Sequence, residues 1–185
     1  MNGANQVAQR RGVLYTVACG APQARHVGTL AALAIDAGWR VCVVATPSAL
    51  KWLDALTLAE LTGHPVRSRY KRPDEPDLLP PPDAILVAPA TSNTVNKWAA
   101  GITDTLALGL VVEATGAGLP VVAMPSTSSG LAAYPAFTRS LAALRDAGVT
   151  VLLGEGGHQP GMSERDPPST FPWHLGLAAL HRRIG

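Results

Sequence analysis

The hydrophobic positions along the chain form short apolar runs that alternate with longer segments of helical periodicity. The runs at residues 12–18, 40–45, 84–88, 120–124 and 149–153 are rich in valine, alanine and leucine and predict buried strands. Helical spacing or composition marks residues 23–37, 56–61, 92–115 (with a break near Gly101), 131–147 and 172–183. Near-continuous apolar strands that alternate with helices are typical of a parallel sheet covered on both faces. We therefore predict a single doubly wound parallel-sheet α/β domain of the Rossmann or flavodoxin-like type.

Local signals predict how several of these elements begin and end. Ser48 is expected to cap a helix that opens after Pro47, because serine is favoured at the N-cap. Residues 65–69 predict one edge strand within an irregular, proline-rich stretch. We expect residues 1–11 to form a disordered tail and residues 12–185 to form the domain, with a mobile loop at 154–172.

Composition excludes several classes of protein. Hydrophobic residues make up 47% of the 185 residues and charged residues 15%, so the chain can bury a core, and its net charge of +2 does not favour nucleic acid as a partner. No apolar run reaches the roughly 18 residues of a membrane span. Cys19 and Cys42 lie in strand-like runs without a metal-ligand spacing, which argues against a disulfide framework and a metal site and favours a reducing cytoplasm.

The segments that follow the predicted strands share small, hydroxylated or glycine residues. In doubly wound sheets, ligands bind outside the carboxyl ends of the strands, where the strand order reverses. Residues 19–21, 46–48, 89–94 and 125–129 occupy these places, and backbone N–H groups at helix N-termini suit a phosphate. Serine and threonine there are equally typical of ordinary helix caps, but four such loops at one edge favour a shared ligand. The P-loop and the glycine-rich dinucleotide fingerprint do not occur, which argues against a Walker NTPase and a standard dehydrogenase.

One stretch after the third predicted strand resembles a known family. Residues 88–106 are similar to the P-A-S-A-N-T-x-x-K-x-A-x-G-I-x-D-x-L signature of the homo-oligomeric flavin-containing cysteine decarboxylases, which include phosphopantothenoylcysteine decarboxylase and the lantibiotic peptidyl-cysteine decarboxylases. The matching positions are Pro89, Ala90, Asn93, Thr94, Lys97, Ala99, Gly101, Ile102, Asp104 and Leu106. Thr46, Ala49 and Trp52 fit a second family segment after the second strand.

The resemblance implies an FMN cofactor and a homo-oligomer, either a trimer or a dodecamer built from trimers. It implies that Gly20, Ala21 and Ser48 hold the phosphate, that residues 91–94 approach the isoalloxazine and ribityl chain, and that Met124 and Ser126 line the flavin. The expected cofactor-binding residues are Gly20, Ala21, Thr46, Ser48, Pro89, Ala90, Thr91, Ser92, Asn93, Thr94, Met124 and Ser126. The implied activity is flavin-dependent oxidation and decarboxylation of a small-molecule or peptide thiol, which is both oxidoreductase and lyase chemistry.

Two positions depart from the family pattern at the catalytic centre. The place of the family's histidine falls near Glu75, and the place of its substrate-binding asparagine is Ser128. The catalytic residues therefore stay unassigned, with His64 as a candidate replacement for the histidine. Losing a positioned acid–base group costs about 10²–10⁴ in rate, and a serine hydroxyl cannot reproduce an amide's paired donor and acceptor.

These departures leave three hypotheses. The first is an FMN-binding flavoprotein with an altered decarboxylase centre, which performs flavin redox chemistry on an unidentified substrate. The second is a working decarboxylase of a C-terminal cysteine peptide or of phosphopantothenoylcysteine. The third is a non-catalytic, flavin-binding regulatory subunit. A flavin prenyltransferase is a more distant alternative.

Overall fold

Five parallel strands form the single sheet of this computed structural model, which describes residues 11–154, 159–161 and 167–185. The strands are β1 (Val13–Ala18), β2 (Arg40–Ala45), β3 (Ala84–Ala90), β4 (Val121–Pro125) and β5 (Thr150–Val151). Their order is β2-β1-β3-β4-β5, and each neighbouring pair is parallel. The predicted doubly wound α/β fold is thus confirmed.

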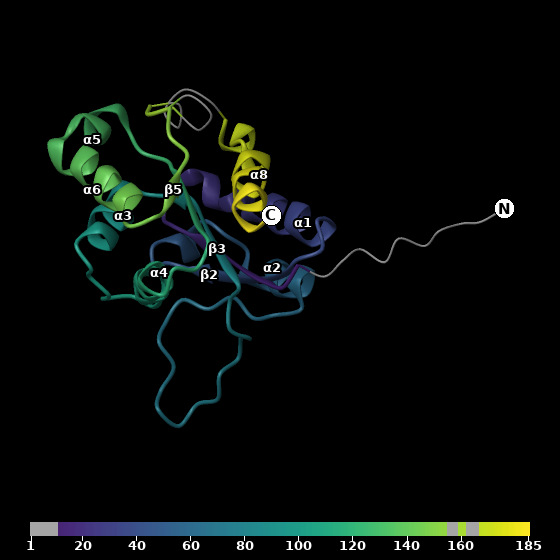
Figure 1. Ribbon diagram of the computed structural model, residues 1–185. Coiled ribbons are helices and arrows are strands. Elements are labelled where there is room, and N and C mark those ends of the chain that lie inside the picture. The colour runs from purple at the N-terminus through teal and green to yellow at the C-terminus, as the bar shows by residue number, and fades with distance from the viewer. Residues whose placement is uncertain (1–10, 155–158, 162–166) are drawn as a thin grey trace.

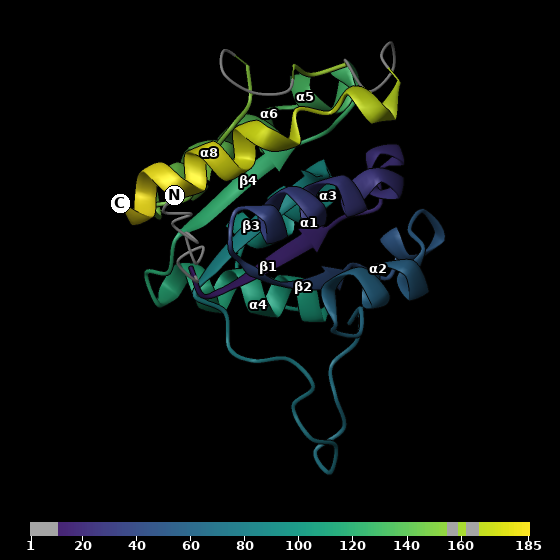
Figure 2. The same ribbon diagram turned by 90° about the vertical axis from the view of Figure 1, so that its right-hand side faces the viewer.

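Helices cover both faces of the sheet (Figures 1 and 2). One face carries α1 (Val27–Asp36), α2 (Ala55–Thr62) and α8 (Trp173–Ile184), and the other carries α3 (Ser92–Ala99), α4 (Leu106–Gly116) and α6 (Pro135–Asp146). Alternation along β1 sends Leu14 into the first core and Tyr15 into the second. Because both faces are covered, all six residues of β1 are buried, which explains its nearly continuous apolar pattern.

Short elements connect the sheet to these helices. They are the 3-10 turns η1 (Pro22–His26), η2 (Ala49–Lys51) and η3 (Pro168–Thr170) and the helix α5 (Ser129–Ala133). Side-chain oxygens of Asp54, Thr91, Thr105 and Ser128 cap α2, α3, α4 and α5 by accepting from backbone N–H groups.

Several predicted boundaries were wrong. Ser48 makes no cap; residues 49–51 form one 3-10 turn, and the helix starts only after Asp54, whose carboxylate accepts from two N–H groups. The predicted edge strand at 65–69 is a single bridge between Arg67 and Val44. The helix predicted at 131–147 is divided at Tyr134 into α5 and α6, because Pro135 opens a new helix at its first position.

The predicted ends of the domain are described only in part. Residues 1–10 of the predicted tail, and residues 155–158 and 162–166 of the predicted loop, lie outside the described residues. Arg11 donates its backbone N–H to the Gly38 carbonyl. Near the other end, the ring of Phe171 lies 4.6 Å from that of Trp173, and both side chains are buried. Within the described ranges, no helix is long and apolar enough to cross a bilayer.

Gly176 sets the distance between α8 and the sheet. A Cβ atom added there would lie 2.5 Å from the Met124 Sδ and 3.0 Å from a methyl carbon of Leu86, and both of these side chains are fully buried. We expect Gly176→Ala to lower the free energy of unfolding by about 1–3 kcal/mol, because the packed core cannot yield. The matched control is Gly116→Ala in α4, where no atom lies within 4 Å and alanine favours the helix. Urea unfolding of both variants measures the difference, and equal stability of the two would contradict this packing.

His181 makes the docking of α8 sensitive to pH. Its Nε2 accepts a hydrogen bond of 3.1 Å from the Trp39 indole N–H, so this nitrogen must be unprotonated. Burial and the nearby Arg11 guanidinium lower the pKa of His181 below its usual 6.5. The unfolded chain therefore binds the proton more readily, and this contribution to stability is lost as the pH falls through about 6.5.

We expect His181→Gln to weaken this pH dependence, because glutamine can accept the same hydrogen bond but does not titrate. Thermal melts at about pH 7.5 and about pH 5.5 provide the measurement. The fall in Tm between them should be smaller in the variant than in the parent chain. An equal fall would show that His181 does not contribute.

Candidate functional site

The strand order reverses between β1 and β3, and the loops that follow four strands meet at this edge. Backbone hydrogen bonds join them: Cys19 N–H donates to the Pro89 carbonyl over 3.0 Å, and Thr46 N–H to the Ala18 carbonyl over 2.9 Å. Ser126 N–H donates to the Ala90 carbonyl over 2.8 Å. The Ala88–Pro89 peptide is cis, and the register of β3 against β4 shifts between Val87 and Ala90. The four segments singled out in the sequence are thus brought together.

A cavity of about 510 Å³ opens among these loops, a volume typical of small-molecule sites. Its lining residues are Gly20, Thr46, Pro47, Ser48, Thr91, Ser92, Asn93, Thr94, Lys97, Thr105, Leu108 and Leu131. Six of these twelve residues carry a hydroxyl group, and Lys97 is the charged side chain among the described lining residues. Such a donor set suits a ligand that carries a phosphate and several hydroxyls.

Gly20 allows two of these loops to touch. A Cβ atom at this position would lie 2.7 Å from the Ser48 Cβ and 3.1 Å from the Ser48 carbonyl carbon. No other residue type fits without moving the backbone of the β2 loop. The close approach places backbone of the β1 loop against Ser48 at the wall of the cavity.

Thr46 carries an unpaired polar atom at the same wall. Its Oγ1 is buried and has no hydrogen-bond partner in the described part of the chain. A buried hydroxyl without a partner costs about 1–3 kcal/mol. Thr46 is one of the residues that line the cavity, so this buried hydroxyl lies close to any group that enters it.

The N-terminus of α3 forms another wall. Thr91 caps the helix: its Oγ1 accepts from Thr94 N–H over 3.5 Å and lies 3.2 Å from the Thr94 hydroxyl. The helix dipole adds partial positive charge at this end. Beneath it, burial raises the pKa of the Cys19 thiol, although hydrogen bonds from Thr94 and Thr91 oppose this shift. Cys19 is therefore a neutral thiol of the core rather than a nucleophile.

Lys97 forms an ion pair with Asp104 in the connection between α3 and α4. About a third of the Lys97 side chain remains exposed, at 32%. The pair holds the Lys97 ammonium beside the cavity, next to Thr105 at the start of α4. An anionic group of a ligand would be stabilised there.

Other predicted residues lie behind the cavity rather than in it. Ala21, Pro89 and Ala90 are buried beneath its wall. Ser126 donates to Gln23 Oε1 over 3.1 Å in a buried pair. Met124 is fully buried in the core against α8, so the structure does not place its side chain at the cavity.

Four lining residues were missed as binding residues by sequence reasoning: Lys97, Thr105, Leu108 and Leu131. Lys97 had a signal, since it occupies the lysine of the quoted signature. Thr105 and Leu108 come from α4, which follows no strand directly, so a search of strand ends could not find them.

Neither of the two positions that depart from the family pattern is among the residues that line the cavity. Glu75 is exposed in the loop before β3, accepts from Arg72 N–H over 3.0 Å and lines a different hollow. Ser128 caps α5 by accepting from Leu131 N–H over 3.4 Å. His64 is half-buried just after α2, where its backbone N–H donates to the Thr62 hydroxyl. It does not line the cavity.

Comparisons with known proteins agree with this arrangement. The family model described as Flavoprotein matches residues 6–168. The coenzyme A biosynthesis bifunctional protein CoaBC of Bacillus subtilis (strain 168) is 30% identical over 130 residues, which cover 67% of this chain and 31% of that protein. A cysteine/cysteine sulfinic acid decarboxylase of unknown prokaryotic origin is 33% identical over 115 residues, which cover 59% of this chain and 30% of that protein. This chain thus spans about a third of the length of these curated relatives.

Solved structures show the same fold. The FMN-dependent cysteine decarboxylase TvaF from thioviridamide biosynthesis superposes with a TM-score of 0.70 at 25% identity, covering 91% of this chain and 98% of TvaF. This structural similarity and the family match over residues 6–168 together identify the family of this chain. The chain belongs to the Flavoprotein family.

Proposed function

We propose that this chain binds FMN in the cavity at the carboxyl edge of the sheet and uses it in redox chemistry on a substrate that is not yet identified. The observation that carries the proposal is the buried, unpartnered hydroxyl of Thr46 on a wall where Gly20 and Ser48 touch. The family relationship and the FMN-dependent cysteine decarboxylase TvaF support this choice of cofactor.

The residues present fit such a group. Backbone near Gly20, the hydroxyls of Thr46 and Ser48 and the N-terminal turn of α3 would hold a phosphate and ribityl chain, since they combine hydroxyl donors with the positive end of a helix. Leu108 and Leu131 offer apolar contact for a ring system. Bound there, FMN would supply an acceptor for two electrons from a substrate.

Among the described residues, the charged side chain that this cavity offers is Lys97. Lys97, paired with Asp104, is a charged side chain at the cavity, and among the described residues the lining includes neither a histidine nor a carboxylate. Lys97 would stabilise negative charge on a bound group. With Glu75 and Ser128 where the family pattern has histidine and asparagine, the decarboxylase centre is altered in this proposal.

We also propose that the chain forms a homo-oligomer. Leu131 and Tyr134, at and after the rim of the cavity, are 54% and 65% exposed, although both are large and hydrophobic. Exposed apolar residues that adjoin a ligand site are typical of an interface. A second copy of the chain that covers them would also shield the site from water.

FMN binding is tested by removing one hydroxyl group while keeping the shape of the side chain. We expect Thr46→Val to weaken FMN binding about tenfold, the effect of one hydrogen bond to a charged or strongly polar group. The control is Thr16→Val, because the Thr16 hydroxyl is also buried and unpartnered but does not line the cavity. Quenching of FMN fluorescence gives both dissociation constants. Equal affinities in the two variants, or a parent chain that takes up no FMN, would contradict the proposed site.

The altered centre is tested by turnover. The FMN-loaded chain is incubated with a C-terminal cysteine peptide and, separately, with phosphopantothenoylcysteine, and loss of carbon dioxide is followed by mass spectrometry. We expect rates at least about 100-fold below those of a family decarboxylase measured in parallel, because a positioned acid–base group is missing. Comparable rates would support the alternative, a working cysteine decarboxylase, while leaving FMN binding intact.

A further inference from the structure

The loop between α2 and β3 projects from the sheet (Figures 1 and 2), and both of its arms are anchored. In the first arm, residues 65–72, the backbone of Arg67 bonds the edge strand β2 twice, to Val43 over 3.1 Å and to Ala45 over 2.8 Å. In the second arm, residues 76–83, the Pro80 carbonyl accepts from the Tyr15 hydroxyl over 2.8 Å. Asp83 Oδ2 accepts from Val13 N–H over 2.7 Å. The projection is therefore a fixed part of the fold.

Tyr70 joins the first arm to α4. Its hydroxyl donates to the Thr103 carbonyl over 3.0 Å, and its ring crosses the helix at Gly109. A Cβ atom at Gly109 would lie 2.0 Å from the Tyr70 hydroxyl oxygen, so only glycine permits this contact. The arm, the helix and the sheet edge thereby form three sides of an enclosure.

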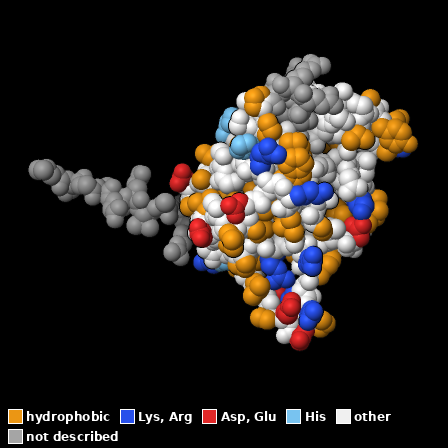
Figure 3. All heavy atoms as spheres, turned by 180° about the vertical axis from the view of Figure 1, so that it is seen from behind, with side chains coloured by type: hydrophobic (Ala, Val, Ile, Leu, Met, Phe, Trp, Pro, Cys, Tyr) orange, Lys and Arg blue, Asp and Glu red, His pale blue; other side chains and the backbone are white. Residues whose placement is uncertain are grey.

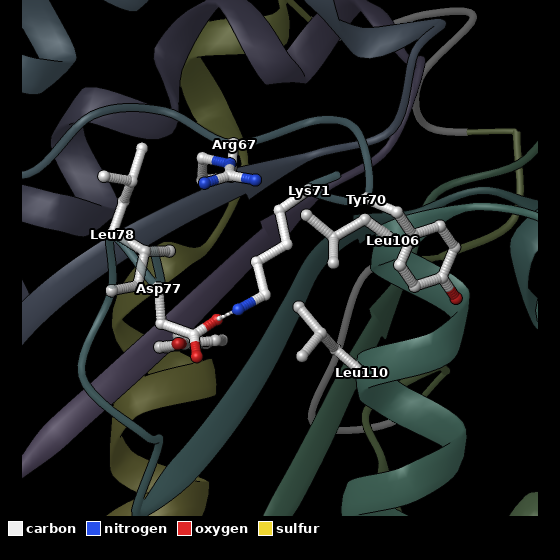
Figure 4. Close-up of a pocket in the computed structure, with 9 residues that line it drawn as sticks. Arg67, Tyr70, Lys71, Asp77, Leu78, Leu106 and Leu110 are labelled. Carbon is white, nitrogen blue, oxygen red and sulfur yellow. Dashed lines mark ion pairs between the residues drawn. The ribbon is translucent and has the colours of Figure 1, made fainter. Parts of the chain in front are cut away.

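A cavity of about 210 Å³ lies inside this enclosure (Figure 4). Leu106 and Leu110 of α4 and Leu79 of the second arm give it an apolar wall. At its mouth, Arg67 and Lys71 approach from the first arm and Asp77 from the second. This combination of an apolar wall and charged groups at the mouth is typical of a site for an amphipathic small molecule.

The charges at the mouth do not cancel. Lys71 pairs with Asp77 over 2.9 Å, which also links the two arms. Arg67 forms no ion pair with any described residue, and its guanidinium makes one hydrogen bond, of 3.3 Å, to the Arg69 carbonyl. Acidic and basic side chains both occur on the projection in Figure 3. Its remaining N–H donors match the two oxygens of a carboxylate.

Tyr15 does not alter this balance. Burial, with the nearby Cys42 thiol and the Asp77 carboxylate, raises its pKa to about 12, against an opposing effect of Arg67. The phenol stays neutral and bonded to Pro80. One net positive charge therefore remains at the mouth, which suits a monoanion better than a dianion.

We propose that this cavity binds a small monocarboxylate with a short apolar body, whose carboxylate pairs with Arg67 and whose body contacts Leu79, Leu106 and Leu110. A volume of about 210 Å³ holds about seven groups the size of a water molecule or a methylene, the size of a six-carbon acid. The site is separate from the candidate FMN cavity, because α4 lies between them: Thr105 and Leu108 line one, Leu106 and Leu110 the other.

The test compares hexanoate with its uncharged analogue hexanamide on the full chain. We expect hexanoate to bind about tenfold more tightly, because only the carboxylate forms charge-assisted hydrogen bonds. Chemical-shift changes of the leucine methyl groups, titrated by NMR, give both dissociation constants. Equal binding of the two probes, or binding of neither, would overturn the proposal.

Two arginines of the same arm supply matched variants. Arg67→Gln should lower hexanoate affinity about tenfold, to the level of hexanamide, whereas Arg69→Gln should leave it within about twofold. Arg69 lies two positions away but does not line this cavity. An equal loss in both variants would assign the effect to general surface charge and overturn the site. FMN uptake is measured on the same samples, so that failure of this proposal is distinguishable from failure of the FMN proposal.

Discussion

Backbone hydrogen bonds between loops are the constraint on which the candidate site depends. The loops after β1, β2, β3 and β4 do not merely end at the same edge; each is bonded to a neighbouring strand or loop, as Cys19 is to Pro89 and Ser126 to Ala90. These bonds satisfy main-chain groups that would otherwise be buried without partners. Several side-chain hydroxyls at the same edge cap helices, as those of Thr91 and Thr105 do, whereas that of Thr46 has no partner within the described residues. Gly20 brings two of these loops still closer together, since its missing Cβ lets the β1 loop touch Ser48.

Thr16 and Thr46 both carry a buried hydroxyl without a hydrogen-bond partner among the described residues. Thr16 lies in the middle of β1 and Thr46 directly after β2, and both side-chain oxygens lack partners within the described chain. Each reduces stability because a hydroxyl has lost water without gaining a hydrogen bond. Thr46 is also one of the described residues that line the candidate FMN cavity.

The fold was largely predictable from the sequence because every central strand is buried on both faces. The apolar runs that contain β1, β2 and β3 are nearly continuous, and the segment that follows the third run carries a specific family signature. Predictions failed where a tertiary contact decided the outcome. Ser48 was expected to be a cap, but it packs against Gly20, and Asp54 caps the following helix instead. Met124 was expected at the flavin because it ends an apolar run at the correct edge; its side chain lies against α8, where Gly176 leaves room for it, and its contact with a flavin stays a prediction.

The residues of α4 could not be found from strand ends, although this helix has a central place in both proposed sites. Residues at the start of α4 line both cavities. Thr105, which caps the helix, and Leu108 line the candidate FMN cavity, whereas Leu106 and Leu110 line the smaller cavity. Tyr70 fixes the helix to the projecting arm across Gly109, and the Lys97–Asp104 pair fixes the segment that precedes it. Any displacement of α4 therefore changes the shape of both cavities together, because one backbone forms a wall of each.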